Sequence, residues 1–228
     1  MDHEQILYHG SQLIVDRPES PYQDMKRDFG PGFYMTASEE LAKEWACSEE
    51  VSGYANKYVL DTFRLRSLDL TSRKFHILNW LAVVLANRKP ALTSDLAIQG
   101  YEYVLDRFYL TAADRCDIIA GWRADNAYYS FAVRFLNNDI TLDELRRAMK
   151  LGKEGKQIVI KTDRALERLR FVSSAPADRS IYYPRIIARD VKARETLQQY
   201  MGTEDDESAR YLVDIMRGEW QNDDPRLR

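Results

Sequence analysis

Cysteine and histidine are scarce in this sequence. The chain of 228 residues contains two cysteines, Cys47 and Cys116, and three histidines. Two thiols are too few for a disulfide framework or a cysteine-rich zinc site, so we expect both to be reduced and structural. The histidines are too few, and too far from acidic clusters, for zinc, and the sequence therefore predicts no metal site.

Segments that direct a chain to a membrane or to export are also missing. No apolar run approaches the ~20 residues that span a bilayer. Residues 1–4 are acidic, whereas a secretory signal begins with basic residues. We therefore expect a cytoplasmic protein without a membrane partner.

The glycine patterns of common nucleotide sites are absent. The run from Gly30 to Gly32 has no third glycine and no following helix, so a Rossmann dinucleotide site is not expected. A Walker loop, a His-Glu-x-x-His motif and a Cys-x-x-Cys motif are missing as well.

What is present is an ordinary globular composition, with 45% hydrophobic and 30% charged residues, which suits one generous domain or a domain with a small appendage. The formal net charge is −3, but it is unevenly placed. Residues 1–60 hold 11 acidic and 5 basic residues, whereas residues 146–170 hold 9 basic and 3 acidic residues. Such a basic stretch is usually a solvated face; alternatively, it binds a pyrophosphate or a polyanionic acceptor.

Hydrophobic periodicity predicts an α+β fold. Strands are expected at residues 6–9, 57–65, 117–120 and 156–161. Helices are expected at residues 75–87, 95–108, 127–136, 142–149, 163–169, 185–201 and 206–220. The helices between residues 75 and 108 would form a helical insertion beside the sheet.

Two capping boxes mark helix starts, Thr36 with Glu39 and Thr141 with Glu144. The helix after Thr36 would bury one stripe and expose the other face. The buried stripe is expected to hold Leu41, Ala42, Trp45 and Ala46, with Glu40, Lys43 and Glu44 outside.

The composition changes after residue 172. Residues 173–176, Ser-Ser-Ala-Pro, are typical of a linker. We therefore predict a domain at residues 1–172 and a helical C-terminal extension at residues 173–228. Acidic residues at 204–207 would favour the start of the last helix.

The first quarter of the chain holds the residues best suited to bind a ligand. His9 is followed directly by Gly10, which pairs a ring donor with a backbone that can come close to a ligand. After the turn formed by residues 30–32, Phe33 and Tyr34 begin a new strand, with one side chain pointing into the core and the other out of it.

These motifs resemble those of the diphtheria-toxin-like and PARP-like ADP-ribosyltransferases. The matching segments are Tyr8-His9-Gly10-Ser11, residues 32–36 with the Trp45-bearing helix, and residues 117–121, 124–126, 157–160 and 165–166. The likeness covers roughly residues 5–172 and is closest to a bacterial family of unknown function within that superfamily. It implies a split antiparallel β-sheet core. The arginine-serine-glutamate pattern of the other branch is absent.

The resemblance also implies that NAD is the substrate. The NAD-binding residues would be His9, Gly10, Ser11, Phe33, Tyr34 and Trp45. His9 would bond the ribose hydroxyls and the Gly10 backbone would pair with the carboxamide. Tyr34 would stack on the nicotinamide, with Trp45 as the second aromatic.

The catalytic residues implied are His9, Tyr34 and Gln157. The best-known relatives carry a glutamate where Gln157 stands. A glutamine keeps the hydroxyl contact but lacks the negative charge, and losing one preorganised electrostatic contact typically costs on the order of 10²–10³ in rate. In the bacterial family that the chain resembles most, glutamine is usual here. Glu154 is the nearby carboxylate that could substitute.

Each of these residues has a simpler structural interpretation. His9 could be a hydrogen-bonded core histidine, Tyr34 and Trp45 could be packing residues, and Gln157 could be a polar residue at a strand edge. Asp125 and Asn126 could belong to a substrate loop, although a helix start is the favoured interpretation.

The resulting hypothesis is an NAD-dependent ADP-ribosyltransferase that modifies a protein or nucleic acid, as a toxin or defence effector with a cognate neutralising protein. Hydrolysis of NAD would be a variant with water as acceptor. The alternatives are a catalytically inactive NAD-binding module and a protein-interaction module that acts through its C-terminal helices.

Overall fold

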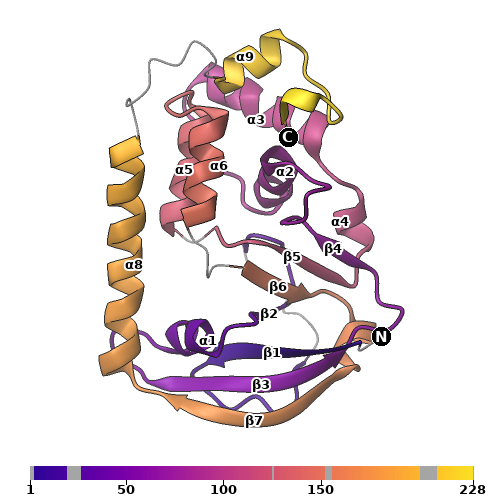
Figure 1. Cartoon of the computed structure of the whole chain (residues 1–228), viewed down its shortest axis with the longest axis vertical. Coiled ribbons are helices and arrows are strands. Elements are labelled where there is room, and N and C mark those ends of the chain that lie inside the picture. Colours follow the sequence, from indigo (N-terminus) through magenta and orange to yellow (C-terminus); the bar gives the residue numbers. More distant parts are fainter. Residues whose placement is uncertain (1–2, 20–26, 125, 152–155, 201–209, 228) are drawn as a thin grey trace.

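The computed structural model describes residues 3–19, 27–124, 126–151, 156–200 and 210–227, and it has an α+β architecture built on two mostly antiparallel open sheets. In Figure 1 the sheets form two layers, with most of the helices stacked beyond the second sheet. Within the described residues, no helix is both long enough and apolar enough to cross a membrane.

The first sheet has the strand order β1-β3-β7 and is antiparallel throughout. It comprises β1 (Glu4–Ser11), β3 (Gly53–Asp61) and β7 (Leu169–Ala177). The strand predicted at residues 57–65 therefore begins and ends four residues earlier.

The linker predicted at residues 173–176 is wrong, because these residues lie within β7 and pair with β3. Pro176 lies opposite Tyr54 in that ladder. A proline is tolerated there because β7 is an edge strand, where a missing N–H breaks no further pairing. The division of the chain after residue 172 stays a prediction, but no linker marks it.

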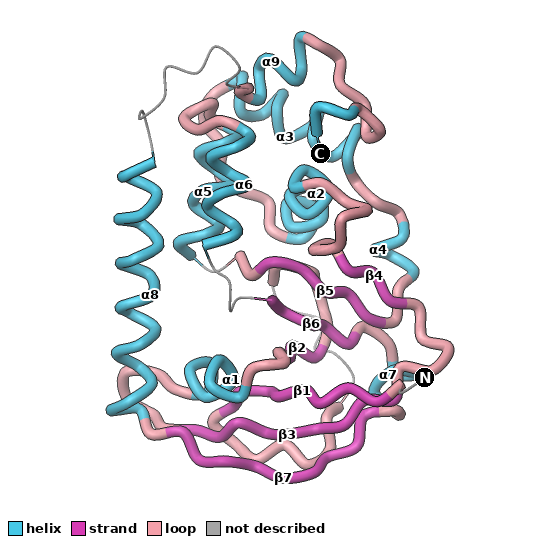
Figure 2. Tube along the Cα trace, in the orientation of Figure 1, coloured by secondary structure: helices cyan, strands magenta, loops and turns pink. Residues whose placement is uncertain are grey.

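The second sheet has the order β2-β6-β5-β4, in which only β4 and β5 run parallel. It comprises β2 (Phe33–Met35), β6 (Lys156–Ile160), β5 (Ile118–Trp122) and β4 (Ser67–Asp69). The sheets meet at a bridge between Tyr8 and Thr36, whose backbones exchange hydrogen bonds of 2.8 and 2.9 Å. Figure 2 shows the two sets of strands as separate layers with α1 beside one end of β1.

Helix α1 (Glu39–Ala46) begins two residues later than the capping box predicts. Its N-cap is Ser38, whose hydroxyl accepts from the Leu41 N–H at 3.2 Å, because Thr36 is held in the bridge to β1. Glu44 was expected outside but is buried, and it forms an ion pair of 2.6 Å with Arg189.

The other helices largely follow the sequence pattern. They are α2 (Ile77–Asn87), α3 (Asp95–Phe108), α4 (Ala112–Arg115), α5 (Asn126–Leu136), α6 (Leu142–Leu151), α7 (Asp163–Leu166), α8 (Arg179–Tyr200), α9 (Leu212–Arg217) and the 3-10 turn η1 (Pro225–Leu227). Residues 77–85 of α2 are all buried, as expected of a helix that is apolar on every side. The capping box at Thr141 is confirmed, since its hydroxyl accepts from Glu144 N and its N–H donates to the Glu144 carboxylate.

The C-terminal helices differ from the prediction. Helix α8 starts six residues before residue 185 and runs along one side of the molecule, against α1, α5 and α6 (Figure 1). Of the helix predicted at 206–220, residues 206–209 lie outside the described residues, and α9 ends at Arg217 with Gly218 as its C-cap. Four buried side chains of residues 212–227 pack in the core that contains α2 and β5, namely Leu212, Ile215, Trp220 and Leu227.

Candidate functional site

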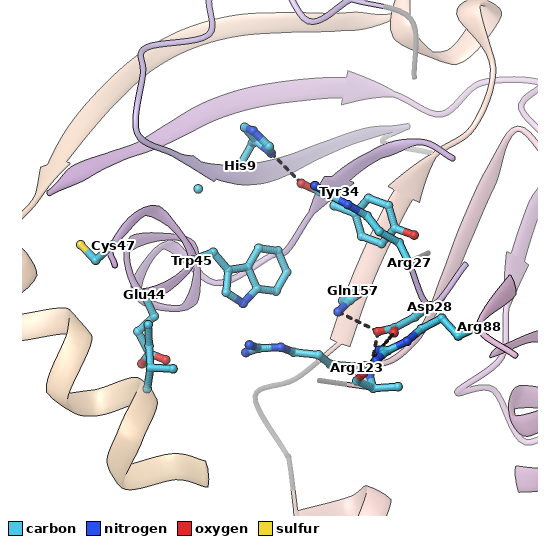
Figure 3. A pocket seen from close by; sticks show the side chains of 13 residues that line it. His9, Arg27, Asp28, Tyr34, Glu44, Trp45, Cys47, Arg88, Arg123 and Gln157 are labelled. Atoms are coloured by element: carbon cyan, nitrogen blue, oxygen red, sulfur yellow. Dashed lines mark hydrogen bonds and ion pairs between the residues drawn. The ribbon is translucent and has the colours of Figure 1, made fainter. Parts of the chain in front are cut away.

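A cleft of about 500 Å³ opens near the bridge between the two sheets (Figure 3). It is lined by His9, Gly10, Arg27, Asp28, Tyr34, Glu44, Trp45, Cys47, Arg88, Arg123, Ala124, Gln157 and Ile186. Five of the seven predicted site residues are among them. The other two, Ser11 and Phe33, line a second hollow of about 450 Å³, which shares His9, Arg27 and Tyr34 with the first.

His9 is fixed between β1 and β2. Its Nδ1 lies 2.8 Å from the Tyr34 carbonyl oxygen, and its ring stacks on Phe33 with centroids 4.2 Å apart. A carbonyl can only accept, so the proton is on Nδ1. Burial lowers the pKa of His9 below its usual 6.5, which favours the neutral ring. The neutral ring then carries a lone pair on Nε2 that can accept from a ligand hydroxyl.

The position of Gly10 is set by close packing against α1. A Cβ at Gly10 would overlap the Ala42 carbonyl oxygen and lie 2.8 Å from the Trp45 Cβ. Backbone groups two residues apart in a strand point the same way, and those of Tyr8 reach across to Thr36. The Gly10 N–H and C=O therefore point away from β3, toward the side of β1 on which the cleft opens.

Tyr34 is buried and its ring forms part of the cleft wall. Its hydroxyl donates to the Gly30 carbonyl at 2.7 Å and accepts from the Phe29 N–H at 3.2 Å. Gly30 has φ = 75°, so the turn depends on a residue without a Cβ. The Arg27 guanidinium lies 4.7 Å from the ring centroid. Burial raises the pKa of Tyr34, which keeps the phenol protonated.

Trp45 lies between core and cleft. Its helix neighbours Leu41 and Ala42 are fully buried, whereas the indole is half-buried and points into the cleft (Figure 3). The Arg123 guanidinium lies 5.5 Å from the centroid of the Trp45 ring. The indole Nε1 is buried and has no hydrogen-bond partner in the described structure. A ligand acceptor in the cleft would satisfy that donor.

Gln157, at the second position of β6, is 8% exposed and bonded to Asp28. Its Nε2 donates to Asp28 Oδ2 at 3.3 Å, while its Oε1 is buried without a hydrogen-bond partner in the described structure. Asp28 also accepts from Arg88 Nη1 at 2.7 Å and from the Ala124 N–H at 2.8 Å. Burial raises the pKa of Asp28, against the lowering effect of these two hydrogen bonds.

The cleft also contains Asp28 and three arginines, which were not predicted from the sequence. Asp28 lies two residues before the turn predicted at residues 30–32, and its place beside that turn was the one available signal. Arg27, Arg88 and Arg123 supply the positive charge of the cleft, not the basic stretch. Glu154 and Asp125, which were also considered, lie outside the described residues.

Four of the nine basic residues in the stretch at residues 146–170 form ion pairs with acidic side chains within the protein. These ion pairs join Arg146 to Asp143, Lys156 to Asp69, Arg164 to Asp117 and Arg168 to Asp61. These pairs favour the structural interpretation of the stretch over an anion site.

Comparison with known proteins gives one match. A family model described as "Protein of unknown function (DUF3990)" matches residues 5–171. No curated protein and no solved structure matches the sequence. The matched range includes every residue that lines the cleft except Ile186, which lies on α8.

Proposed function

The chain belongs to this family of proteins of unknown function, and we propose that it is an NAD-dependent ADP-ribosyltransferase that modifies a macromolecular acceptor. The proposal depends on one observation. His9, Tyr34, Trp45 and Gln157 come from four different elements and line one cleft. The ADP-ribosyltransferase resemblance assigns these same residues to one site, and their convergence supports that assignment.

The shape of the site suits a dinucleotide. The two hollows, of about 500 and 450 Å³, share His9, Arg27 and Tyr34, so a two-part ligand could occupy both. NAD consists of two nucleosides joined by a pyrophosphate. Arg27 lies at the boundary between the hollows, where its charge would meet that pyrophosphate.

The nicotinamide would lie against Tyr34 and Trp45. Its carboxamide carries one acceptor and one donor group, which match the N–H and C=O of Gly10. Arg27 lies over one face of the Tyr34 ring. Stacking of a pyridine on Tyr34 therefore requires the opposite face or a displacement of Arg27.

The ribose would be held by two acceptors. His9 Nε2 and Gln157 Oε1 can each accept a hydrogen bond from a sugar hydroxyl. Cleavage of the bond between C1′ and nicotinamide leaves its electron pair on the pyridine nitrogen, and the sugar becomes oxocarbenium-like. The acceptor nucleophile then forms a bond to C1′ and loses a proton. Fixing the ribose and the pyridine separately favours this dissociation.

The fold and the biological setting are parts of the same proposal. Two sheets joined at one bridge agree with the split-sheet core that the resemblance implies. A toxin or defence role, a cytoplasmic location and a neutralising partner are further proposals from that resemblance.

The direct test uses labelled NAD. Purified protein is incubated with NAD labelled in the adenylate part, together with cell extract, and both transfer of label to macromolecules and release of nicotinamide are measured. We expect both from the wild-type protein and neither from His9→Ala or Tyr34→Ala. If the wild-type protein gives neither transfer nor nicotinamide, the proposal is wrong.

A catalytically inactive NAD-binding module is the second candidate, because Gln157 carries no charge. It predicts saturable NAD binding without release of nicotinamide. Accumulation of nicotinamide over many turnovers would exclude it, and nicotinamide without labelled macromolecule would indicate hydrolysis of NAD.

A further inference from the structure

The contact between Asp28 and Gln157 carries an inference that rests on the proposed function. We infer that Asp28 is a positioning residue, which holds the Gln157 amide with its oxygen toward the cleft. The charge of Asp28 is also the reason that an amide, and not a carboxylate, stands at position 157.

Three groups fix the Asp28 carboxylate (Figure 3). Oδ1 accepts from Arg88 at 2.7 Å, and Oδ2 accepts from the Ala124 N–H at 2.8 Å and from Gln157 at 3.3 Å. The donors come from three separate parts of the chain, and Asp28 as a whole is 5% exposed. It therefore presents a fixed acceptor to Gln157.

This acceptor determines which way the amide faces. A carboxylate beside Arg88 accepts hydrogen bonds and donates none, so Gln157 must turn its NH₂ group to Asp28. The amide oxygen is then on the other side of the planar group. That oxygen is buried and lacks a hydrogen-bond partner among the described residues, which is costly unless a ligand donates to it. A ribose hydroxyl is such a donor.

A glutamate at position 157 would place a second carboxylate beside the first. Two buried carboxylates in contact do not both ionise readily, so one would take up a proton. Arg88 contacts Oδ1, whereas Gln157 contacts Oδ2, so Arg88 does not take the place of the contact between the two side chains. Arg123 and Tyr34 also act on Asp28 electrostatically, but Gln157 is the side chain bonded to Oδ2.

The expected result is the reverse of what the best-known relatives suggest. Gln157→Glu restores their glutamate, yet it should lower kcat for nicotinamide release on the order of 10²-fold, with a much smaller change in KM for NAD. Asp28→Asn should also lower kcat, because the amide at position 157 loses its fixed orientation. The double variant Asp28→Asn with Gln157→Glu exchanges amide and carboxylate while keeping the charge of the pair, and should be faster than Gln157→Glu by roughly tenfold or more.

Asp69, on β4, provides a matched control. Asp69 pairs with Lys156, the residue before Gln157, at 2.7 Å and does not line the cleft. Asp69→Asn should leave kcat unchanged and should not rescue Gln157→Glu. The inference is overturned if the Gln157→Glu variant has the kcat of the wild type. It is also overturned if the double variant, which adds Asp28→Asn, is no faster than Gln157→Glu alone.

A second measurement is independent of catalysis. In protein labelled with ¹⁵N-glutamine, the side-chain NH₂ signal absent from Gln157→Glu belongs to Gln157. Without NAD, its protons should exchange slowly with water in the wild-type protein and faster in Asp28→Asn. Equal exchange in both proteins would refute the positioning role. A wild-type protein that neither binds nor cleaves NAD would refute the proposed function, while the exchange data would still decide the role of Asp28.

Discussion

Replacing Gly10 by alanine tests the packing that brings Trp45 to the cleft. A Cβ at this position would overlap the Ala42 carbonyl oxygen and lie 2.8 and 2.9 Å from the Trp45 Cβ and the Ala46 N. Two of these three atoms belong to the α1 backbone, which cannot turn aside as a side chain can. Helix α1 must therefore shift away from β1.

The expected cost follows from overpacking. Forcing one methyl group into a filled site typically destabilises by about 1–3 kcal/mol. For a domain of this size, that corresponds to a fall of roughly 2–12 °C in the midpoint of thermal unfolding. The shift of α1 would also displace Trp45, and a misplacement of about 1 Å can lower turnover on the order of 10²-fold.

Thermal unfolding and nicotinamide release measure the two effects separately. Gly100→Ala is the matched control, because its one close contact would be with the Cδ2 of Leu212, at 2.5 Å, and the end of a flexible side chain can move. The Leu136 carbonyl oxygen would lie at 3.8 Å, which is an ordinary contact. Alanine also favours helix α3 by about 1 kcal/mol over glycine, which offsets the contact. A Gly10→Ala protein that unfolds like the wild type and releases nicotinamide at the same rate would refute the described packing of α1 on β1.

Three further predictions concern Tyr34, His9 and Ser38. Tyr34→Phe keeps the ring but leaves the Gly30 C=O and the Phe29 N–H without the hydroxyl, so urea unfolding should show a loss of about 1–3 kcal/mol while NAD affinity changes little. Burial lowers the pKa of His9 in the folded state, so as the pH falls the imidazole of the unfolded chain binds a proton before that of the folded protein. The free energy of unfolding should therefore decrease as the pH is lowered through 6.5. Thermal unfolding between pH 7.5 and 5 should detect this, with a smaller fall in His9→Gln. Ser38→Ala removes the cap of α1 and should cost about 1 kcal/mol in the same unfolding assay.

The sequence predicted best those elements that short-range pattern determines. Helix α3 has the predicted bounds, and α5 and α6 agree within two residues, because their apolar positions recur at helical spacing. The Thr141 capping box was predictable because both of its partners lie within four residues. Fold class was predictable for the same reason, since it follows from the types of these elements.

The errors have a common physical origin in contacts between distant segments. Residues 173–176 have a composition typical of a loop, but they form a strand because their backbone pairs with β3. Thr36 is a residue type that often caps helices, and Glu39 follows it at the capping-box spacing. The Thr36 backbone is instead hydrogen-bonded to Tyr8, 28 residues earlier. Glu44 is buried because α8 brings Arg189 to it.

Within the candidate site, too, some residues were predictable and others were not. The resemblance to ADP-ribosyltransferases implied that His9, Tyr34 and Gln157 belong together, and the structure brings them to one cleft. Asp28 could not be assigned, because its partners Arg88 and Gln157 are 60 and 129 residues away. Whether these side chains act on NAD stays a prediction.

Trp220 and Leu227 are buried in the core that contains α2, and this burial has a practical consequence for deletion mapping. A fragment ending near residue 172 would expose the apolar surface that these side chains cover, and would also lack half of β7. Loss of activity in such a fragment would therefore reflect a disrupted fold. It would not show that the C-terminal segment has a function of its own. Point substitutions in the full-length chain separate an effect on folding from an effect on function. One example is Arg185, which pairs with Glu40 on the surface.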